Sequence, residues 1–310
     1  MKRNACLLLL LLLLPFSLFA EEKRAVLVTG ASSGIGKRTT ELLAKEGFYV
    51  YAGARKQKDL DMLNAIDGVE AVRLDVTMHD DIAAAVTQVK SGGRGLYGFV
   101  NNAGVAIIQP LIEVEEGQLD FQFDVNVYGP YRLTRAFAPL LIESKGRVVN
   151  ISSISGVLSG RLAGPYSMSK HALEAYNDSL AREMQDFGVK VSAVEPGNYA
   201  SRLGKNAVAQ AQSKGVNAEG SKFEEEMDKI MQRVSDREDL ADPIAVARAI
   251  QHALADDNPK ARYMVVPNQR EAEITIRKLL QELAELNQDQ PFSYERDALV
   301  KMLDETLEQL

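Results

Sequence analysis

Short apolar runs alternate with segments of helical periodicity along most of the chain. The runs predict seven strands, over residues 25–29, 48–52, 69–74, 98–100, 147–151, 189–194 and 263–266. Between several of them, apolar residues three or four positions apart predict helices, as over 34–46, 82–89 and 244–254. The alternation predicts an α/β fold, a doubly wound parallel sheet of about seven strands in a single domain. Ligands of such sheets bind beyond the carboxyl ends of the strands.

The first twenty residues differ from the rest. Lys2 and Arg3 precede an apolar run that contains eight consecutive leucines at positions 7–14. We interpret residues 1–22 as a signal peptide or a short membrane anchor acting through residues 5–20. This apolar stretch spans about 24 Å as a helix, less than the ~30 Å hydrocarbon core. A start codon assigned upstream of a cytoplasmic enzyme is the alternative, so localisation stays open between these readings.

Composition excludes several function classes. The net charge of −7 gives no support to a nucleic-acid partner. Cys6 is the single cysteine and lies in the leader, so the body has no disulfide, thiolate zinc site or cysteine nucleophile. The three histidines, His79, His171 and His252, lack ligand spacing, and we expect no metal site.

A glycine-rich segment, Thr29 to Gly36, follows the first predicted strand and opens the first predicted helix. Its glycines allow the backbone to approach a pyrophosphate, and the helix N-terminus supplies free N–H groups. The spacing is G-x-x-x-G-x-G, and a tight strand-to-helix turn without a ligand is the alternative. The position after the first strand favours dinucleotide binding.

A second motif, Tyr166-Ser167-Met168-Ser169-Lys170, places a tyrosine and a lysine on one helix face. A nearby ammonium would lower the pKa of Tyr166 from about 10 toward neutrality and make it a usable acid or base. Ser153, just beyond the fifth predicted strand, is placed to donate a hydrogen bond to a carbonyl oxygen. The alternative is a surface pair on a helix.

With these motifs, the chain from about Lys23 to Val266 resembles the short-chain dehydrogenase/reductase family. Further pieces stand in the family's order: Leu74-Asp75-Val76, Asn101-Asn102-Ala103-Gly104, Asn126, Ser152-Ser153 and Pro196-Gly197. The resemblance implies a Rossmann-like oxidoreductase that uses a nicotinamide cofactor to interconvert an alcohol and a carbonyl. It is nearest to the steroid- and retinoid-type branch.

The resemblance also implies roles for single residues. Tyr166 would give or take the proton at the substrate oxygen, and Ser153 would orient that oxygen. Lys170 would bind the nicotinamide ribose, and Asn126 would hold a water in a proton relay. The implied cofactor-binding residues are Gly30, Ser32, Ser33, Gly34, Ile35, Gly36, Arg55, Asp75, Val76, Asn102, Ala103, Gly104, Tyr166, Lys170, Pro196 and Gly197. Ser201 stands where the family usually has threonine. Local capping or loop bonding is the alternative for Asn102 and Asn126.

The end of the second strand indicates which nicotinamide cofactor is used. An acid there would accept bonds from the adenosine ribose hydroxyls and repel a 2′-phosphate. Here the position is Ala54, and Arg55 follows. A guanidinium binds phosphate well, so NADP(H) is favoured. NAD(H) stays open if Arg55 and Lys56 form only a solvated basic turn.

The segments that flank the expected site concern the substrate. Residues 156–165 are small and apolar and predict an apolar pocket wall, and residues 198–240 read as a helical lid. A small-to-medium apolar ketone, aldehyde or alcohol is expected. The alternatives are a 3-oxoacyl-thioester reductase and a non-catalytic NADP(H)-binding sensor.

The chain continues after the oxidoreductase domain, which we place at 23–267. Residues 268–310 carry apolar residues at helical spacing and predict a helical extension. It is a membrane contact, an oligomer contact or a cover of the core. The last two are favoured, because its polar face is acidic. A homo-dimer or homo-tetramer is expected.

Overall fold

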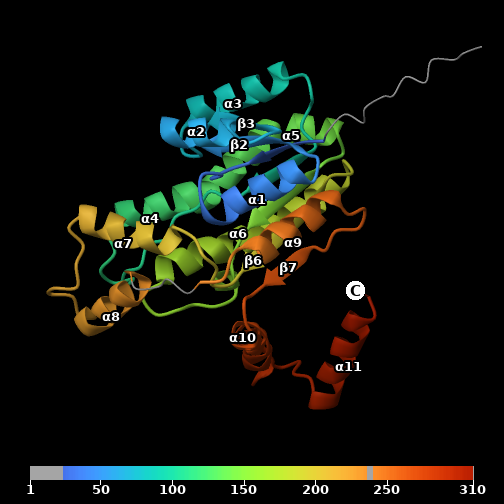
Figure 1. Ribbon diagram of the computed structural model, residues 1–310. Coiled ribbons are helices and arrows are strands. Elements are labelled where there is room, and N and C mark those ends of the chain that lie inside the picture. Colours follow the sequence, from blue (N-terminus) through green and yellow to red (C-terminus); the bar gives the residue numbers. More distant parts are fainter. Residues whose placement is uncertain (1–23, 236–239, 310) are drawn as a thin grey trace, which may run out of the picture.

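The computed structural model describes residues 24–235 and 240–309 (Figure 1). Its strands form one parallel sheet in the order β3-β2-β1-β4-β5-β6-β7. They are β1 (Ala25–Val28), β2 (Tyr49–Ala54), β3 (Val69–Arg73), β4 (Gly98–Asn101), β5 (Arg147–Ile151), β6 (Lys190–Pro196) and β7 (Arg262–Val265). The predicted fold class is confirmed, and each predicted strand is present within two residues of its expected bounds.

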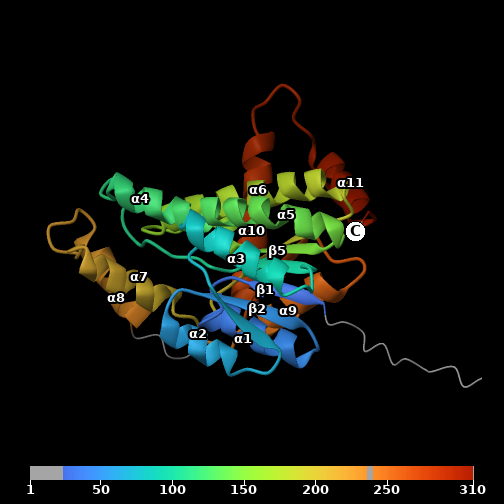
Figure 2. The ribbon, with the colours of Figure 1, turned by 90° about the horizontal axis from the view of Figure 1, so that it is seen from above.

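Helices cover both faces of the sheet (Figure 2). On one face lie α1 (Gly34–Lys45), α2 (Gln57–Asn64) and α9 (Ile244–Ala255); on the other lie α3 (His79–Ser91), α5 (Gly129–Glu143) and α6 (Gly164–Gln185). Successive strand residues point to opposite faces. Val26 and Val28 therefore enter the first core and Ala25 and Leu27 the second. Burial on both faces explains the continuous apolar runs of the sequence.

The connection from β4 to β5 is more helical than the sequence analysis anticipated. It contains α4 (Glu116–Phe123), a π-helical turn η1 (Asp124–Tyr128) and α5, which follow one another directly. A π turn in an α-helix is rare and frequently marks a functional site. Asn126 lies inside it.

The predicted lid segment holds two helices, α7 (Leu203–Ser213) and α8 (Glu224–Ser235). Arg161, in the loop before α6, forms a two-pronged ion pair with Glu226 of α8, with its closest N···O distance 2.7 Å. A small apolar cluster of Leu162, Ala218 and Met227 lies in the same region. These contacts attach the lid segment to the wall of the expected pocket.

The C-terminal hairpin, α10 (Gln269–Asn287) and α11 (Arg296–Leu307), lies apart from the layered body (Figure 1). Its large apolar side chains are 41–78% exposed: Ile274, Ile276, Leu279, Leu280, Leu283, Leu286, Val300, Met302, Leu303 and Leu307. Thr275 is the one residue of the two helices that is buried. Of the two roles favoured from the sequence, cover of the core does not fit these exposed side chains, because both sheet faces are already covered, and an oligomer contact stays a prediction.

The leader assigned to residues 1–22 lies outside the described residues. Among the residues that are described, no helix has the length and apolar character needed to cross a membrane.

Candidate active site

The glycine-rich turn after β1 packs directly on the loop after β4. Gly30 and Gly34 have φ of +64° and +54°, which other residues rarely adopt. A Cβ on Gly30 would lie 2.9 Å from the Ala103 Cα, and a Cβ on Gly36 would collide with the Gly30 carbonyl oxygen. Asn102 donates from Nδ2 to the Thr29 carbonyl at 2.8 Å. The glycines therefore leave the backbone of the turn uncovered by side chains along one wall of a cleft. The Asn102 hydrogen bond holds the turn in place.

That cleft runs along the carboxyl ends of the strands, with residues from every strand end except that of β7. It brings together nearly all the predicted site residues: Gly30, Ser32, Ser33, Gly34, Ile35, Arg55, Asp75, Val76, Asn102, Ala103, Gly104, Ser153, Tyr166, Lys170, Pro196 and Gly197. Gly36 and Asn126 do not line it. Gly36 instead allows α1 to begin in close contact with the glycine-rich turn. Asn126 lies behind the cleft and bonds to Val105, which lines it.

Lys170 lies at one end of the cleft, on α6. It is 6% exposed, and its Nζ donates to the Ile151 carbonyl at the end of β5 at 2.8 Å. Burial lowers the pKa of Lys170 to about 8, against the opposing effect of the Glu174 carboxylate. The Lys170 ammonium therefore loses its proton at a lower pH than the ammonium of an exposed lysine does.

Tyr166, one turn earlier on α6, lies beside this amine. The Lys170 Nζ is 5.7 Å from the centroid of the Tyr166 ring. Burial raises the pKa of Tyr166 to about 12, and a hydrogen bond with Ser153 opposes the rise. The pKa is not lowered toward neutrality as expected from the sequence, because burial disfavours the phenolate more than the Ser153 hydrogen bond favours it. At neutral pH Tyr166 carries its proton.

Ser153 joins the ends of two strands at the same place. It follows β5 and begins the short 3₁₀ turn η2 (Ile154–Gly156), where its Oγ accepts from Ser155 N–H at 3.0 Å. The same hydroxyl donates to the Pro196 carbonyl at the end of β6 at 3.4 Å. Glu195, immediately before Pro196, is also buried, and burial with the nearby Glu174 carboxylate raises its pKa to about 7. We call Ser153, Tyr166 and Lys170 the closed end.

Asn126 ties the loop after β4 to α6. Its Oδ1 accepts from Val105 N–H at 2.9 Å, and its Nδ2 donates to the Val105 carbonyl and to the Ser169 Oγ, both at 3.0 Å. Ser169 in turn donates to the Tyr166 carbonyl at 2.7 Å. These bonds link the loop after β4, through Asn126 and Ser169, to the backbone of Tyr166.

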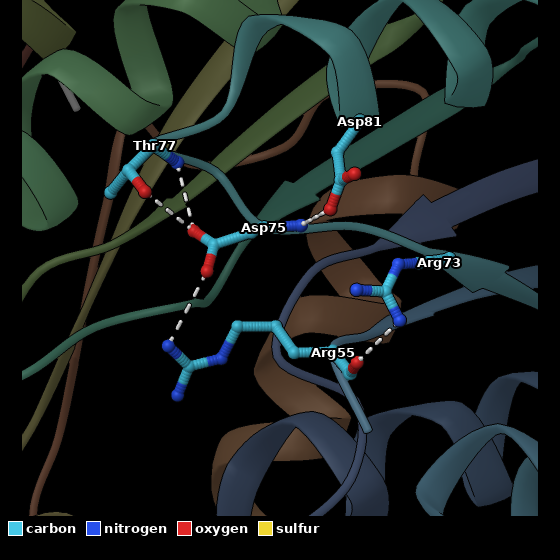
Figure 3. A network of polar contacts seen from close by, with 5 residues as sticks. All are labelled: Arg55, Arg73, Asp75, Thr77 and Asp81. Atoms are coloured by element: carbon cyan, nitrogen blue, oxygen red, sulfur yellow. Dashed lines mark hydrogen bonds and ion pairs between the residues drawn. The ribbon is translucent and has the colours of Figure 1, made fainter. Parts of the chain in front are cut away.

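The other end of the cleft is open and carries a polar network (Figure 3). Arg55 Nη1 lies 3.5 Å from Asp75 Oδ2, and Asp75 Oδ1 accepts from the N–H and hydroxyl of Thr77 at 3.0 and 2.8 Å. Partial burial alone would raise the pKa of Asp75, but the Thr77 hydrogen bonds and the Arg55 charge lower it below its usual value. Arg73 donates to the Arg55 carbonyl at 3.2 Å. We call Arg55 and Asp75 the open end.

The comparisons with known proteins decide the family. Residues 24–212 match the short chain dehydrogenase family. This chain is a short-chain dehydrogenase. It is 35% identical over 254 residues to an NADPH-dependent 3-dehydrocapnine reductase of Ornithobacterium rhinotracheale, covering 79% of this chain and 88% of the relative. It is 35% identical over 256 residues to retinol dehydrogenase 7 of Rattus norvegicus, covering 78% and 80%.

A solved short-chain dehydrogenase from Streptomyces avermitilis shares 31% of its sequence, with a TM-score of 0.73 over 86% of this chain and 96% of that chain. The resemblance to the family is confirmed. The chain is accordingly an oxidoreductase of the short-chain dehydrogenase type, which acts on alcohol and carbonyl groups with NAD(P).

The cleft of this short-chain dehydrogenase fits such a cofactor. The bare glycine turn lies where a pyrophosphate approaches most closely, and a Cβ at Gly30 would fill the wall. Among the residues that the structure describes, the buried Lys170 ammonium has one acceptor, the Ile151 carbonyl, for its three donors. Ribose hydroxyls at the closed end would supply further acceptors.

Sequence reasoning missed several residues that line this cleft. Arg202, Leu203 and Asn206 come from the start of α7, and Tyr199 from the loop before it. Arg73, at the end of β3, does not line the cleft but donates to the Arg55 carbonyl, a contact that the sequence did not indicate. The one available signal was that residues 198–206 follow Pro196-Gly197 at the carboxyl end of β6, where ligands bind.

Proposed function

We propose that this short-chain dehydrogenase is an NADP(H)-dependent enzyme that interconverts a carbonyl and an alcohol on a small-to-medium apolar substrate. The observation that carries the proposal is the closed end itself, where Ser153, Tyr166 and Lys170 meet in one cleft with the glycine turn. An assembly of a protonated phenol, a hydroxyl and a buried amine is suited to move a proton at a substrate oxygen.

The residues of the closed end divide this work. In reduction, the Tyr166 hydroxyl donates its proton to the substrate oxygen, which its raised pKa keeps available at neutral pH. The Ser153 hydroxyl donates a hydrogen bond to the same oxygen and fixes its orientation. Lys170 holds the ribose next to the nicotinamide and favours the phenolate that remains. A bound nicotinamide supplies or accepts the hydride.

The open end supports NADP(H) over NAD(H). β2 ends at the buried Ala54, so no carboxylate stands at the position that would grip both ribose hydroxyls. Arg55 lines the cleft there, and Arg73 is bonded to its carbonyl. The Arg55 guanidinium in the cleft favours a phosphate at the 2′ position. The NADPH-dependent relative supports the same preference.

An apolar substrate is supported by the loop between η2 and α6, which follows Ser153 in the chain. This loop carries Val157, Leu158 and Leu162, which do not line the cleft itself, and Leu162 packs in one apolar cluster with Met227 of α8. The retinol dehydrogenase among the relatives supports the retinoid-type branch.

The test is a panel of ketones, aldehydes, steroids, retinoids and acyl thioesters, each assayed with NADPH and with NADH. We expect turnover on apolar ketones or aldehydes with preference for NADPH. Turnover on acyl thioesters alone would show that the substrate is an acyl thioester and not a small-to-medium apolar ketone or aldehyde. Tight NADPH binding without turnover on any member would favour a sensor.

We also propose that the protein forms a homo-oligomer and that the C-terminal hairpin contributes to it. Rows of apolar side chains on α10 and α11 are exposed, and an extended apolar surface of this kind usually marks an interaction site. Light scattering of the protein and of Leu279→Glu/Leu283→Glu tests this. A monomeric wild-type protein would contradict it.

A further inference from the structure

The chain that leaves β6 returns to the glycine turn. A Cβ on Gly34 would lie 3.0 Å from the Ser201 Cβ and 3.2 Å from the Ser201 Cα. Residue 201 therefore touches the turn that starts α1. Arg202 follows at once, immediately before α7, and lines the same cleft as Gly30, Ser33 and Gly34.

Four charged residues line the cleft: Arg55, Asp75, Lys170 and Arg202. Arg55 pairs with Asp75 at the open end, and Lys170 bonds to the Ile151 carbonyl at the closed end. The guanidinium of Arg202 forms no hydrogen bond or ion pair within the part of the chain that the structure describes. Arg161, by contrast, is fully engaged by Glu226. Arg202 is thus a cation in the cleft whose guanidinium is not paired with another of the described residues.

The order of these cations along the cleft matches the order of groups along a dinucleotide. If Arg55 faces the adenosine ribose and Lys170 the nicotinamide ribose, the pyrophosphate lies between them, at the glycine turn. Arg202 is the charged residue at that middle position. A guanidinium offers two parallel donors that fit phosphate oxygens.

Building on the proposed function, we propose that Arg202 is a cofactor-binding residue that binds the pyrophosphate beside the glycine turn. Asn206, one helical turn further along α7, also lines the cleft and adds an amide donor on the same helix face. Arg202 then serves NADPH and NADH equally, because both contain the pyrophosphate. Arg55 serves only the 2′-phosphate.

This division of work is tested by crossing two variants with three ligands. Arg202→Gln and Arg55→Gln are compared in binding of NADPH, NADH and adenosine 2′-phosphate, which has the 2′-phosphate but no pyrophosphate. Arg202→Gln is expected to weaken NADPH and NADH by about tenfold each, the lower value for a hydrogen bond to a charged group. It should leave adenosine 2′-phosphate unchanged. Arg55→Gln should weaken NADPH and adenosine 2′-phosphate and spare NADH.

Lys205→Gln is the matched control, since Lys205 is an exposed cation on α7 that does not line the cleft. It should bind all three ligands like the wild type. Arg202→Lys keeps the charge without the fork and should lose less affinity than Arg202→Gln. Thermal unfolding of each variant shows that it is folded.

Unchanged NADPH and NADH affinities in Arg202→Gln would overturn the assignment while the proposed function stands. Loss of NADPH affinity alone would also overturn it, since Arg202 would then face the 2′-phosphate. A wild-type protein that binds neither dinucleotide would overturn the proposed function and this inference together.

Discussion

At the open end of the cleft, the Arg55 side chain is 62% exposed and lies 3.5 Å from Asp75, whereas at the closed end Lys170 is 6% exposed. The pKa of Asp75 is lowered, so its charged form is favoured. Burial raises the pKa of Tyr166 to about 12 and lowers that of Lys170 to about 8, so at the closed end it disfavours the charged form of each group. The open end thus stabilises charge, whereas the closed end disfavours it.

The difference follows from what surrounds each group. Asp75 is hydrogen-bonded by Thr77 near the surface, where water and Arg55 support an ion. The closed end lies between β5, β6 and α6, where burial is the largest influence on Tyr166, on Lys170 and on the neighbouring Glu195. Recognition of a phosphate requires a group that stays charged, whereas proton transfer requires groups that can gain and lose a proton. The two ends are built for these two tasks.

The largest effect is expected at the closed end from Tyr166→Phe. Removal of the hydroxyl takes away the proton and leaves the ring to pack, so kcat should fall at least about a hundredfold. The Kd for NADPH should stay nearly the same. Tyr176→Phe is the matched control, because Tyr176 lies on the same helix but outside the cleft. Turnover at the wild-type rate in Tyr166→Phe would show that the assigned acid is wrong.

Lys170→Ala should lower both kcat and cofactor affinity, each by roughly tenfold, because one ammonium serves the ribose and the phenol. A positive charge at this range favours the phenolate, so its loss raises the pKa of Tyr166 further. The pH profile of alcohol oxidation should therefore move to higher pH. Steady-state rates across a pH series measure the shift, and an unmoved profile would leave Lys170 with a structural role only.

These same residues show which features of the fold and of the site the sequence predicts. The strands were predictable because burial on both faces makes them continuous apolar runs, and the motifs follow strand ends. The sequence placed Tyr166 and Lys170 on one helix face, as the structure does. It did not show that Lys170 bonds to the Ile151 carbonyl, because that contact joins α6 to the end of β5.

Other features depend on packing that no local pattern encodes. The π turn at Asn126 reflects bonds to Val105 and Ser169, and Arg202 reaches the cleft only because Ser201 returns to Gly34. The apolar spacing of the C-terminal hairpin correctly predicted helices. It left cover of the core and an oligomer contact both open, since periodicity shows that a helix has an apolar face but not what that face contacts.

Cofactor preference tests the open end. We expect the wild type to prefer NADPH over NADH in kcat/KM, and Ala54→Asp/Arg55→Ala to reverse the preference. The swing should be about tenfold, the lower value for a charged hydrogen bond, because Arg55 is exposed and already shared with Asp75. Lys56→Ala, beside Arg55 but outside the cleft, is the control. A wild-type preference for NADH would mean that Arg55 is part of a solvated turn and does not bind a 2′-phosphate. The roles proposed for the residues of the closed end would be unaffected.

The smallest effect concerns the charge of Asp75 itself. Its pKa is lower in the folded protein than in the unfolded chain, so its ionised form stabilises the fold. That contribution is fully present above the unfolded pKa and is lost as pH falls through the lowered, folded pKa. Asp75→Asn should therefore reduce the free energy of unfolding by about 0.5 kcal/mol at pH 7, a value kept small by exposure.

Urea unfolding of the wild type and Asp75→Asn measures this difference as the pH is lowered from 7. The gap should stay constant while the unfolded aspartate is ionised and narrow once the pH falls below about 4. Arg55→Ala should reproduce only the smaller part of it, because the Thr77 bonds outweigh the Arg55 charge in lowering the pKa. A gap that widened on acidification would mean that Asp75 is destabilised as an ion. The open end would then suppress charge as the closed end does, and the contrast between them would be lost.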